Sequence, residues 1–345
     1  MGTDSGELCW LGRPSAPGEV RRNCVVFGGD LDYVSNVLGL PHFNSTTNPC
    51  SLCLANTSTR QHNDWSSTAE WRGTEVTNRT FLLRLRRPLH PLVAHPLWNI
   101  HTFRHDLLHM ADHHGVISHV VANILWMHLS GHRVGNVLPG RNVEERLAFL
   151  NEDVISFYQA NHVQNRLPPF KLDSIKAGDY PELKGRNVKA ANTRAFVPYV
   201  VALQERAVRM HNTLQNRHMM KVVQSVAGII EVVYGGGCFL TPPELEVLSG
   251  HIARLARHYQ KLSSDAFAAG QELWKQTVKF HFMVAHLVKQ SSLINPTWVQ
   301  GYSGESMVGT TADIYSMCQN GPFHAHVQQV VMTKYRLGLR LLMED

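Results

Sequence analysis

Apolar residues recur at spacings of three and four along residues 101–129, and this period predicts a long helix. Histidine and aspartate crowd its first half, whereas its second half is almost wholly apolar. The recurring positions are Leu107, Leu108, Val116, Ile117, Val120, Val121, Ile124, Leu125 and Leu129. We expect a helix that begins near Thr102, ends before Gly131 and packs its apolar stripe against a core.

The pattern before this helix is shorter and more varied. Residues 1–23 are rich in Gly, Pro and Ser and show no period, which predicts a disordered lead. The apolar run 24–28 ends at two glycines and predicts a buried strand with Asp30 at its carboxyl end. Sheet enzymes place acids at such ends, although Asp30 could instead cap a helix that starts at Leu31.

After residue 140 the pattern becomes strongly helical. A polar connection over 171–192 and the glycines at 235–237 interrupt it, and no repeat of fixed period argues for a solenoid. The spacing predicts helices over 142–162, 197–212, 215–233, 243–263, 265–289, 305–318 and 322–342. A short helix over 64–71 and a strand or helical turn over 80–88 complete the expected elements. The fold class expected is α+β, predominantly α.

Composition narrows the class of protein. The chain has 345 residues, 43% of them hydrophobic, which is ample for a core. It has no run of 18 apolar residues, so we expect no membrane partner. Six cysteines are too sparse for a disulfide scaffold and no hydrophobic signal core is seen, so we expect a nuclear or cytoplasmic protein.

The net charge of +6 favours an anionic partner, and double-stranded DNA is the one we expect. The alternative is that the cations only form solvated helix faces. Further basic groups lie at 194 and 206–221. The candidate DNA-binding residues are Arg84, Arg86, Arg87, Lys184, Arg186 and Lys189.

Cys50 and Cys53 form a CxxC motif in a loop rich in Asn, Ser and Thr. Two thiolates at this spacing can bind one tetrahedral ion, but a zinc site needs four ligands and the chain has no second CxxC. His42, His62 or His101 could complete the set. The alternative is a pair of free thiols in a reducing compartment.

Asp106 and His109 are three residues apart, so on a helix they share one face and can serve one site. His105, His109 and His113 follow one another at spacings of four, which would allow a transition-metal face on the same helix. Histidines stacked in this way also occur as partly solvated structure, and that alternative stays open.

Taken in order, five strings resemble transposases of the CACTA type, and most closely the transposase-like proteins of dinoflagellates. They are Gly29–Asp32, Cys50–Cys53, Asp106–His109, Lys279–His281 and Glu305–Gly309. The resemblance implies a partial RNase H-like core with a large all-helical insertion. It divides the chain into a lead (1–23), a core segment (24–130), the insertion (131–300) and C-terminal helices (301–345).

The resemblance also implies site roles. Asp30 and Glu305 would hold Mg²⁺ for phosphoryl transfer on DNA, with Asp32 as the reserve for Asp30. Asp106 and His109 would position the site or bind a phosphate, and the CxxC cysteines would bind structural Zn²⁺.

One catalytic aspartate of the family pattern has no counterpart, because that acid lies well upstream of the position that Asp30 matches. We therefore expect an N-terminally truncated, degenerate copy with weak strand-transferase or nuclease activity or none. The alternative is a catalytically inactive scaffold that binds DNA or protein. A homo-oligomer is compatible with either function.

Overall fold

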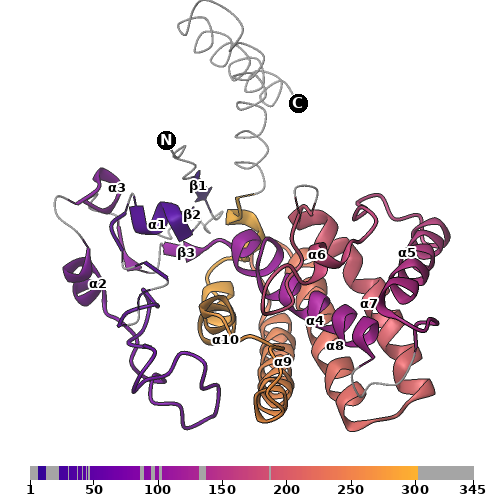
Figure 1. Cartoon of the computed structure of the whole chain (residues 1–345). Helices are drawn as coiled ribbons and strands as arrows, with labels where there is room; N and C mark the ends of the chain where they lie inside the picture. The colour runs from indigo at the N-terminus through magenta and orange to yellow at the C-terminus, as the bar shows by residue number, and fades with distance from the viewer. Residues whose placement is uncertain are drawn as a thin grey trace, which may run out of the picture.

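The structure is a computed structural model of the chain (Figure 1). It describes residues 7–12, 23–29, 31–36, 38–40, 42–43, 45, 47–85, 89–94, 98–100, 103–131, 137–185 and 188–301. A small sheet and the loops around it lie on one side, and a larger body of helices lies on the other. Among the described residues, no helix is both long and apolar enough to cross a membrane.

The sheet has three strands in the order β1–β2–β3. β1 (Glu7–Gly12) pairs antiparallel with β2 (Asn23–Gly29), and β2 pairs parallel with β3 (Phe103–His105). The strand expected over 24–28 is thus confirmed. β1 lies inside the segment 1–23, where we expected only a disordered lead; its backbone groups are satisfied by pairing with β2, which a count of Gly, Pro and Ser does not reveal.

The helix expected over 101–129 is correct only in its second half. The structure has strand β3, then the π-helix η2 (Leu108–Asp112), then α4 (Val116–Ser130). The prediction failed at 103–105 because these three residues are all buried and their backbone pairs with β2. The predicted end is confirmed, since Gly131 ends α4 in the left-handed conformation at φ 73°.

The helices that lie near the sheet, between β2 and β3 in the sequence, are short. Thr77 caps α2 (Asn78–Arg84), so of the two alternatives for 80–88 the helical one is confirmed over 80–84, while residues 86–88 lie outside the described residues. α1 (Leu31–Asn36) follows β2, and α3 (Pro91–Ala94) precedes β3. The segment 64–71 forms turns rather than the expected helix, because the Asp64 carboxylate accepts the Ser66 N–H and closes a local turn instead.

The helical body follows the predicted pattern only in part, because the helix predicted from residue 197 begins at Ala190 and the break predicted at residue 264 falls inside a helix. The helices predicted over 305–318 and 322–342 lie outside the described residues. The helical body comprises α5 (Val143–Ala160), α6 (Leu172–Ile175), α7 (Ala190–Met210), α8 (Leu214–Gly235), α9 (Pro242–Ala268) and α10 (Val278–Ser291). The break expected at residue 264 is absent, because α9 continues through it with a Lys261–Asp265 ion pair one turn apart. Gly270, at φ 64°, allows the turn that follows α9.

α4 is the centre of the main hydrophobic core, and nearly all of its side chains are buried. The same core contains Cys50, Cys53 and Trp65 from the loops, together with residues of α7, α8, α9 and α10. A second, smaller cluster includes Phe81 of α2 and Phe103 of β3. The loops and the helical body therefore share one hydrophobic core, and this packing fixes the CxxC loop against α10. A short 3-10 helix, η3 (Pro296–Val299), follows α10.

Candidate metal centre and the neighbouring acid

Two cysteines from one loop meet two histidines from α10. The Sγ of Cys50 lies 3.2 Å from Nε2 of His286, and the Sγ of Cys53 lies 3.2 Å from Nε2 of His281. The four ligand atoms all lie within 4.8 Å of one another, and all four residues are buried. These residues form the only group of three or more such side chains that could hold a metal ion among the residues that the structure describes.

The surroundings hold each ligand in place. Nδ1 of His281 lies 3.1 Å from the carbonyl oxygen of His62, so its N–H can donate there while Nε2 faces the cysteines. The ring of Trp71 stands edge-on to that of His281, at 4.8 Å between centroids. The Arg84 guanidinium reaches the carbonyl oxygens of Cys50 and Cys53 at 3.5 and 3.4 Å. The loop is thereby also held by α2, which carries Arg84.

The pKa shifts of these side chains favour a metal site over a pair of unreactive thiols. Hydrogen bonding from Cys50, and then from His281 and His286, lowers the pKa of the Cys53 thiol to about 2 despite burial. Burial raises the pKa of the Cys50 thiol. Burial also lowers the pKa of His286, which keeps its imidazole neutral and able to bind a cation. The shifts of the two cysteines therefore favour one thiolate, on Cys53. A bound cation would offset the negative charge of a second thiolate on Cys50.

The donor set fits one tetrahedral ion. With Zn–S near 2.3 Å and Zn–N near 2.0 Å, the ligand atoms of a tetrahedral site stand about 3.3–3.8 Å apart. The observed separations, 3.2 Å for the two Cys–His pairs and up to 4.8 Å for the rest, bracket this range. Two sulfur and two nitrogen ligands fill all four positions, so the group is suited to a structural ion with no open position for water.

The sequence analysis identified two of the four candidate ligands of this centre. The CxxC pair is confirmed as two ligand candidates, but the expected partners His42, His62 and His101 are not among the four. His62 contributes only its carbonyl oxygen, and His101 lies outside the described residues. His281 and His286 were missed because more than 220 positions separate them from the cysteines. The Lys279–His281 string was the one available signal.

α10 also holds the end of the sheet. The Gln290 side chain accepts a hydrogen bond from the His105 N–H at 3.3 Å and donates to the Phe103 carbonyl at 3.5 Å. The His105 ring stacks on Phe282 with centroids 4.1 Å apart. One helix therefore carries both histidine ligands and positions β3. Because Asp106 follows β3 directly, the metal centre and this acid are mechanically linked.

Asp106 is buried and accepts hydrogen bonds from three donors. Its Oδ1 accepts the N–H groups of Leu108 and Gly301, each at 3.0 Å, and its Oδ2 lies 2.7 Å from Nδ1 of His109. Gly301 is needed there, since a Cβ at that position would approach Oδ2 to 2.7 Å. Asp106 and His109 thus form the expected pair, but Asp106 precedes the π-helix that carries His109, so they do not share a regular helix.

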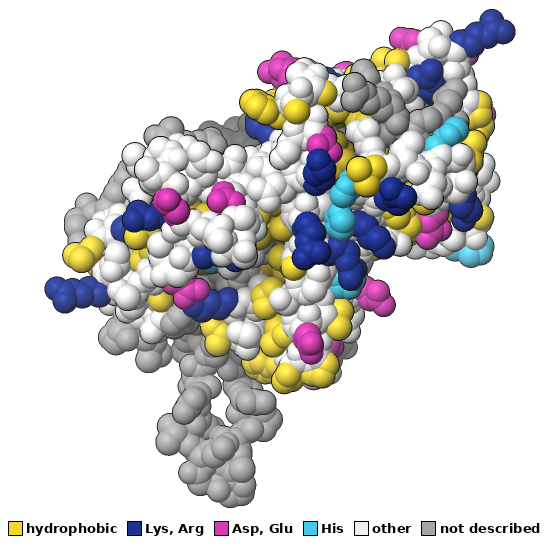
Figure 2. All heavy atoms as spheres, turned by 90° about the horizontal axis from the view of Figure 1, so that it is seen from below, with side chains coloured by type: hydrophobic (Ala, Val, Ile, Leu, Met, Phe, Trp, Pro, Cys, Tyr) yellow, Lys and Arg dark blue, Asp and Glu magenta, His cyan; other side chains and the backbone are white. Residues whose placement is uncertain are grey.

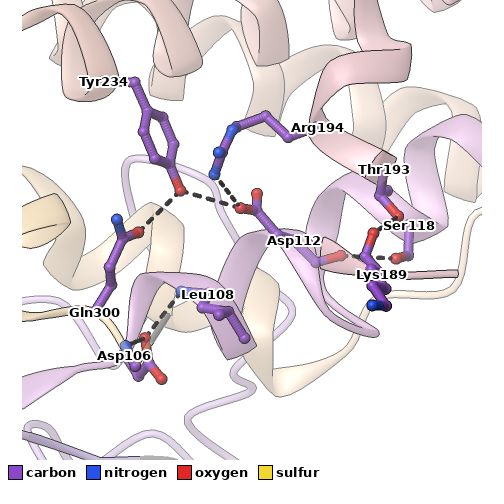
Figure 3. Close-up of polar contacts among 10 residues, drawn as sticks. Asp106, Leu108, Asp112, Ser118, Lys189, Thr193, Arg194, Tyr234 and Gln300 are labelled. Carbon is purple, nitrogen blue, oxygen red and sulfur yellow. Dashed lines mark hydrogen bonds and ion pairs between the residues drawn. The ribbon is translucent and has the colours of Figure 1, made fainter. Parts of the chain in front are cut away.

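The far end of the same π-helix carries a second buried acid, Asp112 (Figure 3). Its Oδ2 accepts from Arg194 of α7 at 2.8 Å and from the Tyr234 hydroxyl of α8 at 3.0 Å. The same hydroxyl lies 3.0 Å from Oε1 of Gln300. π-helical turns are frequent at functional sites, and here the turn is fixed to α7 by an ion pair and to α8 by a hydrogen bond.

The three-histidine face expected on one helix is not present. His105 belongs to β3 and is stacked on Phe282, whereas His109 lies on the π-helix and His113 ends it. The rings of His109 and His113 are edge-on with centroids 5.7 Å apart. Because the segment is not one helix, the spacing of four does not align these rings, and this metal hypothesis is wrong.

Only some of the remaining candidate residues are described. Asp30, Arg86, Arg87, Arg186 and Glu305 lie outside the described residues. Of the described candidates for DNA contact, Arg84 is directed at the CxxC loop, Lys184 pairs with Glu182 at 3.1 Å, and Lys189 is exposed before α7. The expected convergence of Asp30 and Glu305 stays a prediction.

The chain matches no protein-family model, no curated protein and no solved structure. Its function is therefore inferred from the sequence and from the geometry of these residues.

Proposed function

We propose that the chain is a transposase-like protein that acts on DNA and uses a structural Zn²⁺ ion to hold its acid-bearing strand in place. The observation that supports this best is the position of α10. It supplies two of the four buried metal-ligand candidates and also hydrogen-bonds β3, the strand that Asp106 follows. Zinc at the Cys50, Cys53, His281 and His286 site would lock the CxxC loop, α10 and β3 into one unit.

The sheet supports the placement of acids at one edge. β2 and β3 run parallel, and their last residues, Gly29 and His105, are partners in the register. Asp30 and Asp106 are the next residues in the sequence after these strand ends. In the proposal, Asp30 and Glu305 hold Mg²⁺, which would stabilise charge on a scissile phosphate. Asp106 and His109 position the site, a role that suits a carboxylate already bound by three donors.

Zinc content tests the structural part. Purified protein should contain one zinc ion per chain, and Cys50→Ser or His286→Ala should lose most of it because three ligands bind far more weakly than four. Cys238→Ser is the matched control, since Cys238 forms no disulfide and is not one of the four candidate ligands. Zinc retained by Cys50→Ser, or lost equally from Cys238→Ser, would refute the site.

Plasmid nicking tests the catalytic part. With Mg²⁺ or Mn²⁺ we expect slow nicking of supercoiled DNA, abolished by Asp30→Asn or Glu305→Gln because each removes a proposed metal ligand. Glu144→Gln, at an exposed acid of α5, is the control, and it should nick like the wild type. Nicking that survives both Asp30→Asn and Glu305→Gln would contradict the assignment.

The inactive scaffold is the second candidate, and one observation favours it. Both oxygens of Asp106 are engaged by protein donors, which is also what a purely structural acid would show. Such a protein would bind DNA without any metal-dependent nicking.

A further inference from the structure

We propose that the outer face of the α8–α9 hairpin binds the phosphate backbone of duplex DNA. The proposed basic face consists of Arg217 and Lys221 of α8 together with Arg254, Arg257 and Lys261 of α9. All five residues are exposed. This proposal rests on the proposed DNA-directed function. Arg217 and Lys221 belong to the basic group at 206–221 that the sequence indicated, whereas the three cations of α9 do not. The surface can be tested without catalysis.

Two histidines bring the basic residues of the two helices together. His218 of α8 and His258 of α9 face each other across the hairpin with their Nδ1 atoms 2.7 Å apart. Besides burial, His218, Arg257, Lys221 and Arg254 lower the pKa of His258. Burial, Lys261 and Arg217 lower the pKa of His218, against the opposing effect of Asp265. The cations are thus close enough to create one positive field.

Little negative charge offsets this field. Lys261 pairs with Asp265 at 2.7 Å, whereas none of the other four cations of the basic face forms an ion pair with a described acid. Figure 2 shows Lys and Arg side chains gathered around histidine on the underside of the molecule. Like charges held together without acids are costly unless a polyanion neutralises them.

The spacing suits a row of phosphates. Arg217 and Lys221 are one helical turn apart, and Arg254 to Lys261 spans two turns, or about 10 Å. Since the helices run side by side, the cations form a two-row strip that a polyanion can follow. Duplex DNA carries one charge per roughly 1.7 Å of its axis, so such a strip can contact several phosphates at once.

The strip continues into a groove of about 640 Å³ between the loop at 65–72, α9 and α10. Arg257 belongs to both the basic face and the groove, and Arg72 and Gln260 line it farther on. A protruding DNA backbone can enter a groove, whereas a flat membrane surface cannot. The exposed apolar residues Leu214 and Phe267 lie toward the α8 start and the α9 end, so vesicle binding is the alternative to exclude.

The experiment compares two fourfold variants with equal loss of charge. The face variant combines Arg217→Gln, Lys221→Gln, Arg254→Gln and Arg257→Gln. The control combines Arg79→Gln, Arg141→Gln, Arg166→Gln and Lys171→Gln, all exposed positions outside the basic face and outside the candidate DNA-binding residues named from the sequence. Circular dichroism and zinc content verify that both remain folded.

Binding to a fluorescent 30-base-pair duplex is measured without Mg²⁺ between about 50 and 200 mM salt, the range over which counterion release is steep. The face variant should bind at least tenfold more weakly, and its log–log salt slope should shrink by up to about 3.6, which is 0.9 for each phosphate that is no longer neutralised. The control should keep the wild-type slope. Because Mg²⁺ is absent, a chain that never cuts DNA still gives this signal.

Equal weakening of both variants would mean that only net charge matters and would overturn the proposal. So would an unchanged face variant, or a wild type that binds phosphatidylserine vesicles but not duplex DNA. Loss confined to the control would place the DNA contact outside the basic face and would also overturn the proposal.

Discussion

Arg194 is the residue whose removal should reveal how much one buried charge pair contributes. It donates to Asp112, whose side chain has no exposure, and its guanidinium lies 3.8 Å from the ring centroid of Tyr234. Arg194→Met should lower the free energy of unfolding by on the order of 3 kcal/mol, because the Asp112 charge then stays buried without its cation. Urea unfolding followed by circular dichroism measures the change.

Lys261→Met is the matched control, because Lys261 pairs with Asp265 where both side chains are half exposed. That pair should contribute no more than about 0.5 kcal/mol. If the two variants lose equal stability, the Asp112 network does not hold the π-helix.

Among single residues, the sequence predicted local chemistry well and distant chemistry poorly. Cys50 and Cys53 were found because their spacing is itself the signal, and Asp106 with His109 because they are three apart. His281 and His286 are five apart on a helix, so no helical face pairs them, and they are two of 21 histidines. Only the fold brings them to the cysteines.

Among the elements, α10 is the one that links the metal centre to the sheet. Gln290 of this helix bonds two backbone groups of β3, so Gln290→Ala should leave the His105 N–H and the Phe103 carbonyl without these partners. We expect a loss of about 1–3 kcal/mol and faster amide hydrogen exchange in β3.

Gln159→Ala, at an exposed position of α5, should change neither quantity. Unaltered exchange at 103–105 in the Gln290 variant would show that α10 does not position the strand.

The elements also show where periodicity is sufficient and where it is not. The stripe over 116–129 is a buried helix as predicted, because nothing else competes for those backbone groups. Upstream, the same spacing continued into 103–112, but β2 offered β3 a hydrogen-bonding edge, and the Asp106 carboxylate accepted the Leu108 N–H. The strand partner comes from residues more than 70 positions away, which a local pattern does not contain.

For the whole molecule, the buried histidines predict a stability that falls in mild acid. Burial lowers the pKa of both His119 and His128 to about 4, whereas in the unfolded chain each would titrate near 6.5. Between these values the unfolded chain binds more protons, so the stability is present above pH 6.5 and is lost as the pH falls toward 4. Thermal unfolding at pH 7.5, 6.5, 5.5 and 4.5 should show a steadily falling Tm.

His128→Gln separates this effect from protonation of the metal ligands. Nε2 of His128 lies 3.0 Å from Oε1 of Gln204, a contact that a glutamine amide can replace. The variant should lose less Tm between pH 6.5 and 4.5 than the wild type. An identical decline would mean that His128 takes no part in it.

X-ray absorption at the zinc K-edge reports the ligands of the ion itself, so it is the sharpest test of the proposed metal centre. We expect two sulfur ligands near 2.3 Å and two nitrogen ligands near 2.0–2.1 Å in the purified protein, as a Cys₂His₂ site requires. His286→Ala should lose one nitrogen ligand or the ion altogether. A spectrum with no sulfur ligand, or with four, would rule out a centre built from Cys50, Cys53, His281 and His286.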